Sequence, residues 1–261
     1  MTRVRPLLEA FDVGPGRVLS LAGAGGKTAL MYALARALLA EGRRVLTTTT
    51  TRIYPPGTDE SPVLLVLEEH PDGEQAIGPL LAEHGHLTVA QRRNPDGKLA
   101  GIPCALVGAL AAAGAADVII VEADGSAGRP LKAAREGEPA WAPSSTHCVL
   151  VVGADALGAP LDETHVFRST LAAEIAGLPL GAPVTDEAAV RLLVGPRGLA
   201  RLAPPSSRLL VFVNKVESPA QEARALGLAR ALLRAGAPRL ARVVVGSLRE
   251  RGAGFTVVER P

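Results

Sequence analysis

Cysteine is scarce in this chain of 261 residues. The two cysteines, Cys104 and Cys148, lie far apart and form no C-x-x-C pair. A disulfide framework needs several cysteines, and a structural zinc or iron–sulfur site needs closely spaced ones, so the sequence predicts neither. Histidine offers no H-E-x-x-H or paired metal spacing, and no Ser-His-Asp arrangement is recognisable. We expect His147 and His165 to be structural or surface residues.

Long apolar runs and a surplus of either charge are also absent. No apolar run approaches the ~20 residues that a membrane-spanning helix needs, and residues 1–16 contain no apolar stretch typical of a signal peptide. The formal net charge is +2 and the arginines are scattered, so the composition favours neither nucleic acid nor an anionic membrane as a partner. We therefore expect a cytoplasmic protein that binds neither.

Lysine is rare, although positive charge is not. Of the 28 lysine and arginine residues only four are lysine, namely Lys27, Lys98, Lys132 and Lys215. Because arginine serves everywhere else in the chain, the lysines are candidates for positions that need a compact ammonium group rather than a planar guanidinium group. Three of them, Lys27, Lys132 and Lys215, fall within the motifs described below.

Hydrophobic residues make up 48% of the chain, which is enough for a packed core. Short apolar runs typical of buried strands alternate with segments of helical periodicity, such as Leu30, Leu34 and Leu38 at a spacing of four. Strands that alternate with helices form a mostly parallel sheet with helices on both faces. No linker or repeat divides the chain, so we expect one α/β domain over residues 1–261.

The pattern places each element within an approximate range. We expect strands within residues 17–21, 44–52, 63–67, 117–126, 147–158, 208–217 and 241–248. We expect helices within residues 28–42, 104–114, 162–177, 184–195 and 219–236. Residues 55–103, approximately, are rich in Gly, Pro, His and Asp and predict a small irregular or β insertion, with a hairpin around residues 94–98.

Residues 20–28 read SLAGAGGKT and end as a phosphate-binding loop does, with Gly-Lys-Thr at the start of a helix. The usual pattern is G-x-x-x-x-G-K-[ST], and its first glycine falls on Leu21. Leu21 closes the apolar run, so the loop is shorter and carries its glycines at Gly23, Gly25 and Gly26. The order strand–loop–helix predicts a fold like that of the P-loop NTPases.

The end of this loop predicts the phosphate contacts. Backbone N–H groups from Gly25 to Thr28 are expected to face phosphate oxygens at the helix N-terminus, where the helix dipole also favours an anion. Lys27 then neutralises the β- and γ-phosphates, and the Thr28 hydroxyl binds Mg²⁺. The alternative is an ordinary tight turn, but a lysine in the first turn of a helix opposes the dipole and has no purpose there.

Two carboxylates follow the apolar run VIIVEADGS. A phosphate loop needs a carboxylate at the end of a neighbouring strand to hold Mg²⁺, and Glu122 and Asp124 are the candidates. They lie two residues apart, so both side chains face the same way along an extended strand. We assign both to the metal and to the attacking water, while an ordinary polar turn remains the alternative.

The segment VNKVE follows another buried strand and resembles the guanine-reading N-K-x-D motif of GTP-binding proteins. Asn214 and Lys215 match that motif, and Glu217 replaces the aspartate. A carboxylate there accepts hydrogen bonds from the N1–H and N2–H₂ groups of guanine, which adenine does not offer. The sequence favours GTP and leaves ATP open, because these residues are also ordinary at the end of a strand.

Two further segments have open roles. The run Thr47–Thr51 is typical of a strand, yet it ends at the carboxyl edge of the sheet, where a late threonine or Arg52 can approach the γ-phosphate or its metal. Residues 124–139 combine glycines with Arg129 and Lys132, as a nucleotide-sensing switch or a solvated loop does.

Together, GAGGKT, RVLTTTTTRIYPP, VIIVEADGSAGRPLKA, VVGADALGAPLDETHVFR and VNKVE resemble the YqeC family, from about Gly23 to Glu217. The family consists of accessory proteins of selenium-dependent molybdenum hydroxylases. The resemblance implies an NTP-binding α/β protein that assists maturation of such an enzyme. Its partners are then the client hydroxylase or the proteins that load the cofactor of that hydroxylase.

Three hypotheses follow. The first is an Mg²⁺-dependent NTPase that binds GTP or ATP, with GTP favoured, and serves such a client. Its proposed catalytic residues are Lys27, Glu122 and Asp124. The second is an ATP-dependent kinase or transferase for a small molecule on the same fold. The third is a non-catalytic scaffold that binds nucleotide only for stability.

Overall fold

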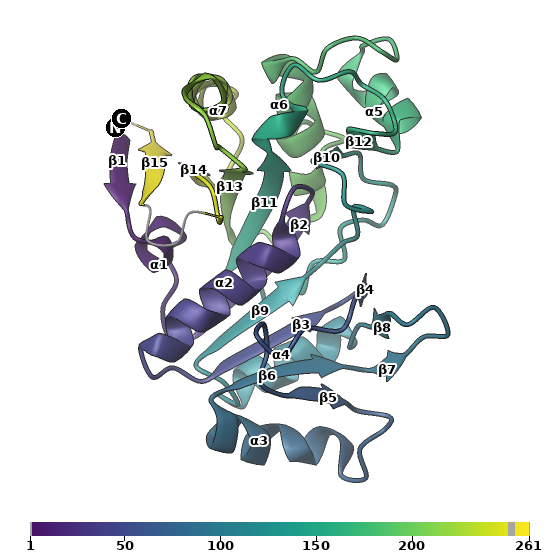
Figure 1. The fold of residues 1–261 in the computed structure, drawn as a ribbon, viewed down its shortest axis with the longest axis vertical. Helices are drawn as coiled ribbons and strands as arrows, with labels where there is room; N and C mark the ends of the chain where they lie inside the picture. Colours follow the sequence, from purple (N-terminus) through teal and green to yellow (C-terminus); the bar gives the residue numbers. More distant parts are fainter. Residues whose placement is uncertain (1, 250–253, 261) are drawn as a thin grey trace.

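The computed structural model describes residues 2–249 and 254–260, and Figure 1 shows their arrangement. Within these residues a ten-stranded sheet runs in the order β1-β15-β14-β13-β11-β2-β9-β3-β6-β5. Neighbouring strands from β14 to β5 are parallel, whereas β15 pairs antiparallel with both β14 and β1. The prediction of an α/β fold with a mostly parallel sheet is confirmed. The strands of this sheet are β1 (Thr2–Arg5), β2 (Arg17–Gly23), β3 (Val45–Thr49), β5 (Leu64–Val66), β6 (His86–Ala90), β9 (Val118–Glu122), β11 (His147–Gly153), β13 (Arg208–Asn214), β14 (Leu240–Val245) and β15 (Phe255–Glu259).

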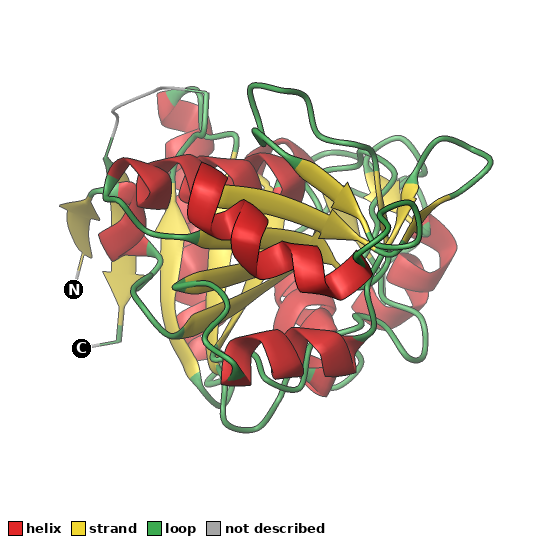
Figure 2. Cartoon of the chain, turned by 90° about the horizontal axis from the view of Figure 1, so that it is seen from below, coloured by secondary structure: helices red, strands yellow, loops and turns green. Residues whose placement is uncertain are grey.

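Helices cover both faces of the sheet, as expected (Figure 2). One face packs against α1 (Leu7–Ala10) and α2 (Lys27–Ala40). The other face packs against α3 (Ile77–His84) and α4 (Cys104–Ala112) at one end, and against α5 (Ser169–Ala176), α6 (Asp186–Val194) and α7 (Pro219–Arg234) at the other. Three short 3₁₀ turns are η1 (Gly73–Ala76), η2 (Ala154–Ala156) and η3 (Leu199–Leu202).

Alternation along β2 shows how the sequence produces these layers. Leu19 and Leu21 are fully buried in the core beneath α2, whereas Val18 and Ala22 face the cores on the opposite side. Side chains two residues apart share a face of a strand, so a continuous apolar run serves both layers at once. This pattern explains Leu21: a glycine there would remove a core side chain from the strand.

Two small sheets stand apart from the main one. Parallel strands β10 (Leu131–Lys132) and β12 (Val166–Phe167) form the first. The antiparallel strands β4 (Arg52–Ile53), β8 (Leu99–Ala100) and β7 (Arg92–Arg93) form the second, and β7 and β8 make the hairpin expected around residues 94–98.

Two predictions need correction. The segment 55–103 contains strands, as predicted, but it is more than a small insertion, because β5 and β6 extend the main sheet and α3, which was not predicted, packs beside them. The helix expected over residues 162–177 begins only at α5. Before it, the Asp162 carboxylate accepts hydrogen bonds from the backbone N–H groups of Thr164 and His165, and β12 then pairs with β10. A side chain that bonds its own backbone in this way favours a turn over a helix.

No helix in the described ranges combines the length and the apolar character needed to cross a membrane.

The register aligns the carboxyl ends of four strands. Leu21 of β2 lies beside Glu122 of β9, and Val151 of β11 lies beside Gly23. The far end of β11 pairs with Asn214, the last residue of β13. In parallel sheets ligands bind at this carboxyl edge. The fold thus gathers at one edge the segments that the sequence singled out.

The chain has only four phenylalanines, and three of them meet at one place. The ring centroid of Phe212 lies 5.1 Å from that of Phe11 and 5.9 Å from that of Phe255, both edge to face. Phe212 belongs to β13, Phe11 follows α1, and Phe255 begins β15. The cluster therefore fastens both ends of the described chain to the strand that carries Asn214.

We predict that Phe212→Ala lowers the free energy of unfolding by about 3–5 kcal/mol, because it leaves a cavity and removes two aromatic contacts. Urea denaturation measures the loss. Leu202→Ala, at a side chain that is 46% exposed, is the control and should change stability by less than about 0.5 kcal/mol. Equal losses in the two variants would contradict this account of the core.

Candidate functional site

The loop that the sequence predicts to bind phosphate, residues 23–28, lies between β2 and α2 and needs its glycines; we keep the name phosphate loop for it. Gly23, Gly25 and Gly26 have φ angles of 99°, 89° and 125°, a region that other residues rarely adopt. A side chain at Gly25 would collide with the backbone of Gly153, and one at Gly26 with the side-chain amide of Asn214. The loop is thus packed closely against the ends of β11 and β13.

The helix that follows the loop presents unpaired donors. α2 begins without a side-chain cap. Within the described residues, no acceptor receives the backbone N–H groups of Gly25, Gly26, Lys27 or Thr28. Such groups at a helix N-terminus attract an anion, and here they lie beside a cavity.

Lys27 is buried at this helix start. Its ammonium group donates a hydrogen bond to the carbonyl oxygen of Gly23 at 2.7 Å and to the hydroxyl of Ser126 at 3.2 Å. It also lies 3.3 Å from Asp124 Oδ1 and 3.8 Å from Glu122 Oε1. The two carboxylates offset the unfavourable position of a cation at a helix N-terminus.

Thr28 and Glu122, which the sequence assigns to a metal site, lie in contact with each other. The Thr28 hydroxyl donates a hydrogen bond of 2.6 Å to Glu122 Oε2. Burial raises the pKa of Glu122, while the charge of Lys27 and the Thr28 hydrogen bond act in the opposite direction. Both residues line the cavity, so one oxygen ligand from the start of α2 and one from the end of β9 face the same space.

Asp124 is placed differently from Glu122. Its side chain is fully buried and is not among the residues that line the cavity. Its two oxygens accept the backbone N–H of Gly23 at 3.1 and 3.0 Å, and one lies 2.9 Å from the Lys132 ammonium. Together with Lys27, these contacts leave Asp124 holding the phosphate loop rather than open to a ligand.

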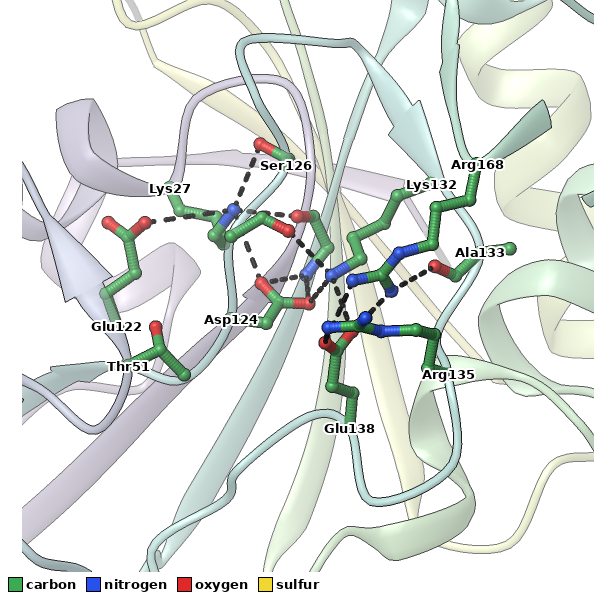
Figure 3. A network of polar contacts seen from close by, with 12 residues as sticks. Lys27, Thr51, Glu122, Asp124, Ser126, Lys132, Ala133, Arg135, Glu138 and Arg168 are labelled. Carbon is green, nitrogen blue, oxygen red and sulfur yellow. Dashed lines mark hydrogen bonds and ion pairs between the residues drawn. The ribbon is translucent and has the colours of Figure 1, made fainter. Parts of the chain in front are cut away.

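A chain of polar contacts continues from Asp124 into the rest of the molecule (Figure 3). Lys132, also fully buried, donates to the carbonyl oxygen of Gly125 at 2.7 Å and lies 3.5 Å from Glu138 Oε2. Arg168 binds both oxygens of Glu138, at 2.5 and 2.9 Å. We call the set Lys27, Asp124, Lys132, Glu138 and Arg168 the polar relay.

Glu138 is strongly bound at the end of the relay. Burial alone would raise the pKa of Glu138, but hydrogen bonds from Arg168 and the charge of Lys132 lower it to about 2. Arg168 immediately precedes α5 and has a positive φ of 63°. The relay therefore connects the phosphate loop to the start of a helix on the opposite face of the sheet.

The expected base-binding residues lie at the end of β13. The side-chain amide of Asn214 donates to the carbonyl oxygen of Gly25 at 2.8 Å, and its oxygen accepts the backbone N–H of Leu248 at 3.3 Å. Lys215 lines the cavity and pairs with Asp155 at 2.8 Å. Glu217 pairs with Arg249 and lines a separate cavity of about 310 Å³ that also includes Ser247.

The threonine run is structural for most of its length. Thr47 and Thr48 are buried and bond to β6, while Thr49 donates to the carbonyl oxygen of Glu122 at 2.7 Å. Thr50 likewise donates to the carbonyl oxygen of Ala140. Thr51 accompanies Thr49, with 3.3 Å between their hydroxyl oxygens.

Of the remaining candidate residues, one lines the cavity and three do not. Arg52 lines the cavity, whereas Arg129 donates to the carbonyl oxygens of Glu163 and Ala127 on the surface. His147 is buried between Thr146 and Asp12 and serves the core, as expected. His165 pairs with Asp162, three residues away.

The cavity beside the phosphate loop has a volume of about 710 Å³. Its lining combines the loop and Glu122 with residues 125–128, Lys215, and a side of the small antiparallel sheet contributed by Arg52, Ile53, Tyr54 and Lys98. Sequence reasoning missed Tyr54, Lys98 and Ser126. A signal for Lys98 existed in the scarcity of lysine: three of the four lysines line this cavity, and the fourth, Lys132, contacts Asp124 directly behind it.

The donor set decides which metal fits. No group of three or more His, Cys, Asp or Glu side chains in the described ranges is arranged to hold a metal ion alone. Thr28 and Glu122 offer one hydroxyl and one carboxylate. This set suits Mg²⁺, which keeps several waters and is bound through one or two protein oxygens together with substrate phosphates.

Comparisons with known proteins agree on one family. The sequence model of the family described as YqeC protein matches residues 19–170, which include the phosphate loop, β9 and the polar relay up to Arg168. The protein described as "Uncharacterized protein YqeC" of Escherichia coli strain K12 is 35% identical over 221 residues, covering 81% of this chain and 82% of that protein. Neither description states an activity.

We predict that Lys132→Met lowers the free energy of unfolding by about 3–5 kcal/mol, because it removes the buried cation that the buried Asp124 shares with the partly buried Glu138. The same substitution at Lys215, whose ion pair with Asp155 is partly exposed, should cost less than about 1 kcal/mol. Urea denaturation at neutral pH compares them. A small loss in both variants would show that the relay does not stabilise the fold.

Glu138 gives the relay a pH dependence. Its pKa is about 2 in the folded protein against an ordinary value of 4.5, so the ionised form stabilises the fold above pH 4.5, and this contribution disappears as the pH falls towards 2. We therefore predict that Glu138→Gln is less stable than the wild type at pH 7 and that the difference shrinks between about pH 5 and pH 2.

Urea denaturation at several pH values measures this difference. Glu136→Gln, which removes an exposed carboxylate two residues away, should follow the wild type throughout. A Glu138→Gln difference that stays constant from pH 7 to pH 3 would contradict the assignment.

Proposed function

The chain belongs to the YqeC protein family, and we propose that it is an Mg²⁺-dependent nucleotide-binding protein with a P-loop NTPase-like domain over residues 1–261. Because the description of its E. coli relative states no activity, the proposal is argued from the site. The nucleotide is a nucleoside triphosphate, with GTP favoured. One observation carries the proposal: a glycine loop, a buried lysine and four backbone N–H groups that have no acceptor among the described residues converge on one cavity.

The triphosphate binds against the phosphate loop, where the Lys27 ammonium now contacts the Gly23 carbonyl oxygen. Its oxygens accept the backbone N–H groups at the start of α2, and the Lys27 ammonium turns from the Gly23 carbonyl oxygen to the phosphates. Asp124 retains Lys132 and the Gly23 N–H group as partners when Lys27 moves. Asp124 thus still holds the phosphate loop on its buried side, while the N–H groups on the cavity side bind the anion.

Mg²⁺ is proposed to bind beside the Thr28 hydroxyl and Glu122. When bound, the ion neutralises charge on the phosphates. Glu122 also accepts a hydrogen bond from a water placed near the γ-phosphorus. In hydrolysis the oxygen of that water bonds to the γ-phosphorus as the bond from this phosphorus to the β–γ bridging oxygen breaks. The nucleoside diphosphate leaves with the electron pair of that bond, and both protons of the water leave with the released phosphate as dihydrogen phosphate.

The end of β13 supports guanine. Asn214 ties the phosphate loop to the backbone at Leu248, so the two segments that would border a base are connected through one side chain. The neighbouring cavity offers the Glu217 carboxylate for the N1–H and N2–H₂ groups of guanine. Glu217 is paired with Arg249, whose side chain is 80% exposed, and such a surface pair exchanges readily.

The role in the cell rests on the resemblance of the sequence to the YqeC family. It suggests that nucleotide binding or hydrolysis assists maturation of a selenium-dependent molybdenum hydroxylase in the cytoplasm. The polar relay supports a switch, because a ligand that draws Lys27 from Asp124 alters the charge balance that reaches Glu138 and Arg168. Two alternatives remain: a kinase or transferase, and a scaffold without catalysis. They differ from an NTPase, and from each other, in how they turn over nucleotide.

A thermal-shift experiment tests nucleotide binding. The non-hydrolysable analogues GMPPNP and AMPPNP are added with and without Mg²⁺. At about 100 times its Kd, a ligand stabilises the folded state by roughly 2.7 kcal/mol. We predict a shift with GMPPNP that Lys27→Ala abolishes and whose Mg²⁺-dependent part Glu122→Gln removes. Arg36→Ala, on the exposed side of α2, is the matched control and should retain the full shift.

The outcomes separate the hypotheses. If neither analogue shifts the wild type, the nucleotide site is wrong. If AMPPNP shifts the melting temperature and GMPPNP does not, the role given to Asn214 and Glu217 is wrong. Phosphate release from GTP then distinguishes an NTPase from a scaffold.

A further inference from the structure

The cavity extends from the phosphate loop to Arg52, Tyr54 and Lys98. In the main sheet, β13 lies two strands from β2 on one side and β3 lies two strands from it on the other. Neighbouring strands are about 4.8 Å apart, so each side reaches roughly 10 Å from the phosphate loop. The base is proposed on the β13 side. The β3 side, where the chain continues into Arg52 and Tyr54, lies beyond the γ-phosphate.

The wall on that side is the small antiparallel sheet. Arg52 pairs with Ala100 and Ile53 with Leu99, and the residues next to these pairs are Tyr54, after β4, and Lys98, before β8. Ile53 and Leu99 are buried. Alternate residues of a strand face opposite sides, so Arg52 and Tyr54 lie on one side of β4. Both line the cavity together with Lys98, and the buried Ile53 contributes to the same wall.

These three side chains suit a ligand with an anionic group and a ring. The Lys98 ammonium lies 4.8 Å from the centroid of the Tyr54 ring, and Tyr54 is 70% exposed although it is aromatic. Arg52 pairs with Asp96 at 2.7 Å, with side chains that are 57% and 47% exposed. An exposed ion pair of this kind is worth about 0–1 kcal/mol, so a bound anion displaces Asp96 from Arg52 easily.

The choice of lysine at position 98 supports a specific role. The chain uses 24 arginines and four lysines, and Lys98 is the one lysine that lies outside the motifs described in the sequence analysis. Lys98 lines the same cavity as Lys27 and Lys215. A lysine kept beside Arg52 gives the wall one compact cation and one planar cation, which together surround an oxyanion.

We propose that Arg52, Tyr54 and Lys98 form a second binding site, for a small organic oxyanion that carries a planar ring, next to the γ-phosphate end of the nucleotide. The oxyanion binds between Arg52 and Lys98, and the ring packs on Tyr54. This inference builds on the proposed nucleotide site, because it places the second ligand where it contacts the nucleotide or what the nucleotide acts on.

Pyridoxal 5′-phosphate tests the site, since it joins a phosphate to a planar ring and reports on lysine. Its aldehyde condenses with an uncharged lysine amine, with loss of water, to give an imine. Borohydride then adds hydride to the imine carbon and water supplies a proton to the nitrogen, which fixes the label. Peptide mass spectrometry assigns the label among the four lysines.

With GMPPNP and Mg²⁺ present, we expect Lys98 to be labelled and Lys215 to be protected. Inorganic phosphate should slow the labelling of Lys98. Arg52→Gln should slow it by at least about fivefold, which corresponds to the loss of one modest charged contact. Arg92→Gln is the matched control, because Arg92 lies on β7 of the same small sheet but does not line the cavity, and it should label like the wild type.

Two results would overturn the second site. If GMPPNP with Mg²⁺ blocks the labelling of Lys98, Arg52 and Lys98 serve the nucleotide itself. If Lys98 is labelled equally in Arg52→Gln and is indifferent to phosphate, it is an ordinary surface lysine. Failure of the nucleotide site is distinguishable from both, because GMPPNP would then give no thermal shift and no protection of Lys215.

Discussion

The buried carboxylate of Asp124 is the interaction on which the site depends. It accepts the backbone N–H of Gly23 and is shared by the ammonium groups of Lys27 and Lys132. A buried carboxylate without such partners would be costly, and two buried lysines without it equally so. Because the three charges require one another, they fix the distance between the phosphate loop, β9 and β10. The loop is therefore shaped before any ligand arrives, and Lys27 is held at the point where an anion is expected.

The two sides of Asp124 have different contacts. On its inner side Asp124 leads through Lys132 to Glu138 and Arg168, at the start of α5. On its outer side Lys27, Thr28 and Glu122 face the cavity. A ligand in the cavity competes only for the outer partner, Lys27, so the relay keeps its structure while its charge balance changes. A nucleotide-dependent change at α5 is thus physically reasonable without any large movement of the sheet.

Part of this site was predictable from the sequence. GAGGKT predicted the loop, and the acid-terminated apolar run predicted that Glu122 would approach Thr28, because both signals are local and the sheet aligns them. The pairing of Lys132 with Asp124 was not, since it depends on how residues 125–131 fold back. Lys98 was missed because β4, β7 and β8 are two residues long and leave no periodic pattern. The edge strands β1 and β15 were missed because they pair with each other across almost the whole chain, as Val4 does with Thr256.

The central claim is that Asp124 holds the loop while Lys27 is released to a phosphate. A crystal structure with GMPPNP and Mg²⁺ tests it most directly. We predict that the Lys27 ammonium contacts phosphate oxygens, that the metal lies beside Thr28 and Glu122, and that Asp124 still joins the Gly23 N–H group to Lys132. A structure in which the nucleotide binds elsewhere, or in which Lys27 remains on the Gly23 carbonyl oxygen with the nucleotide bound, would contradict it.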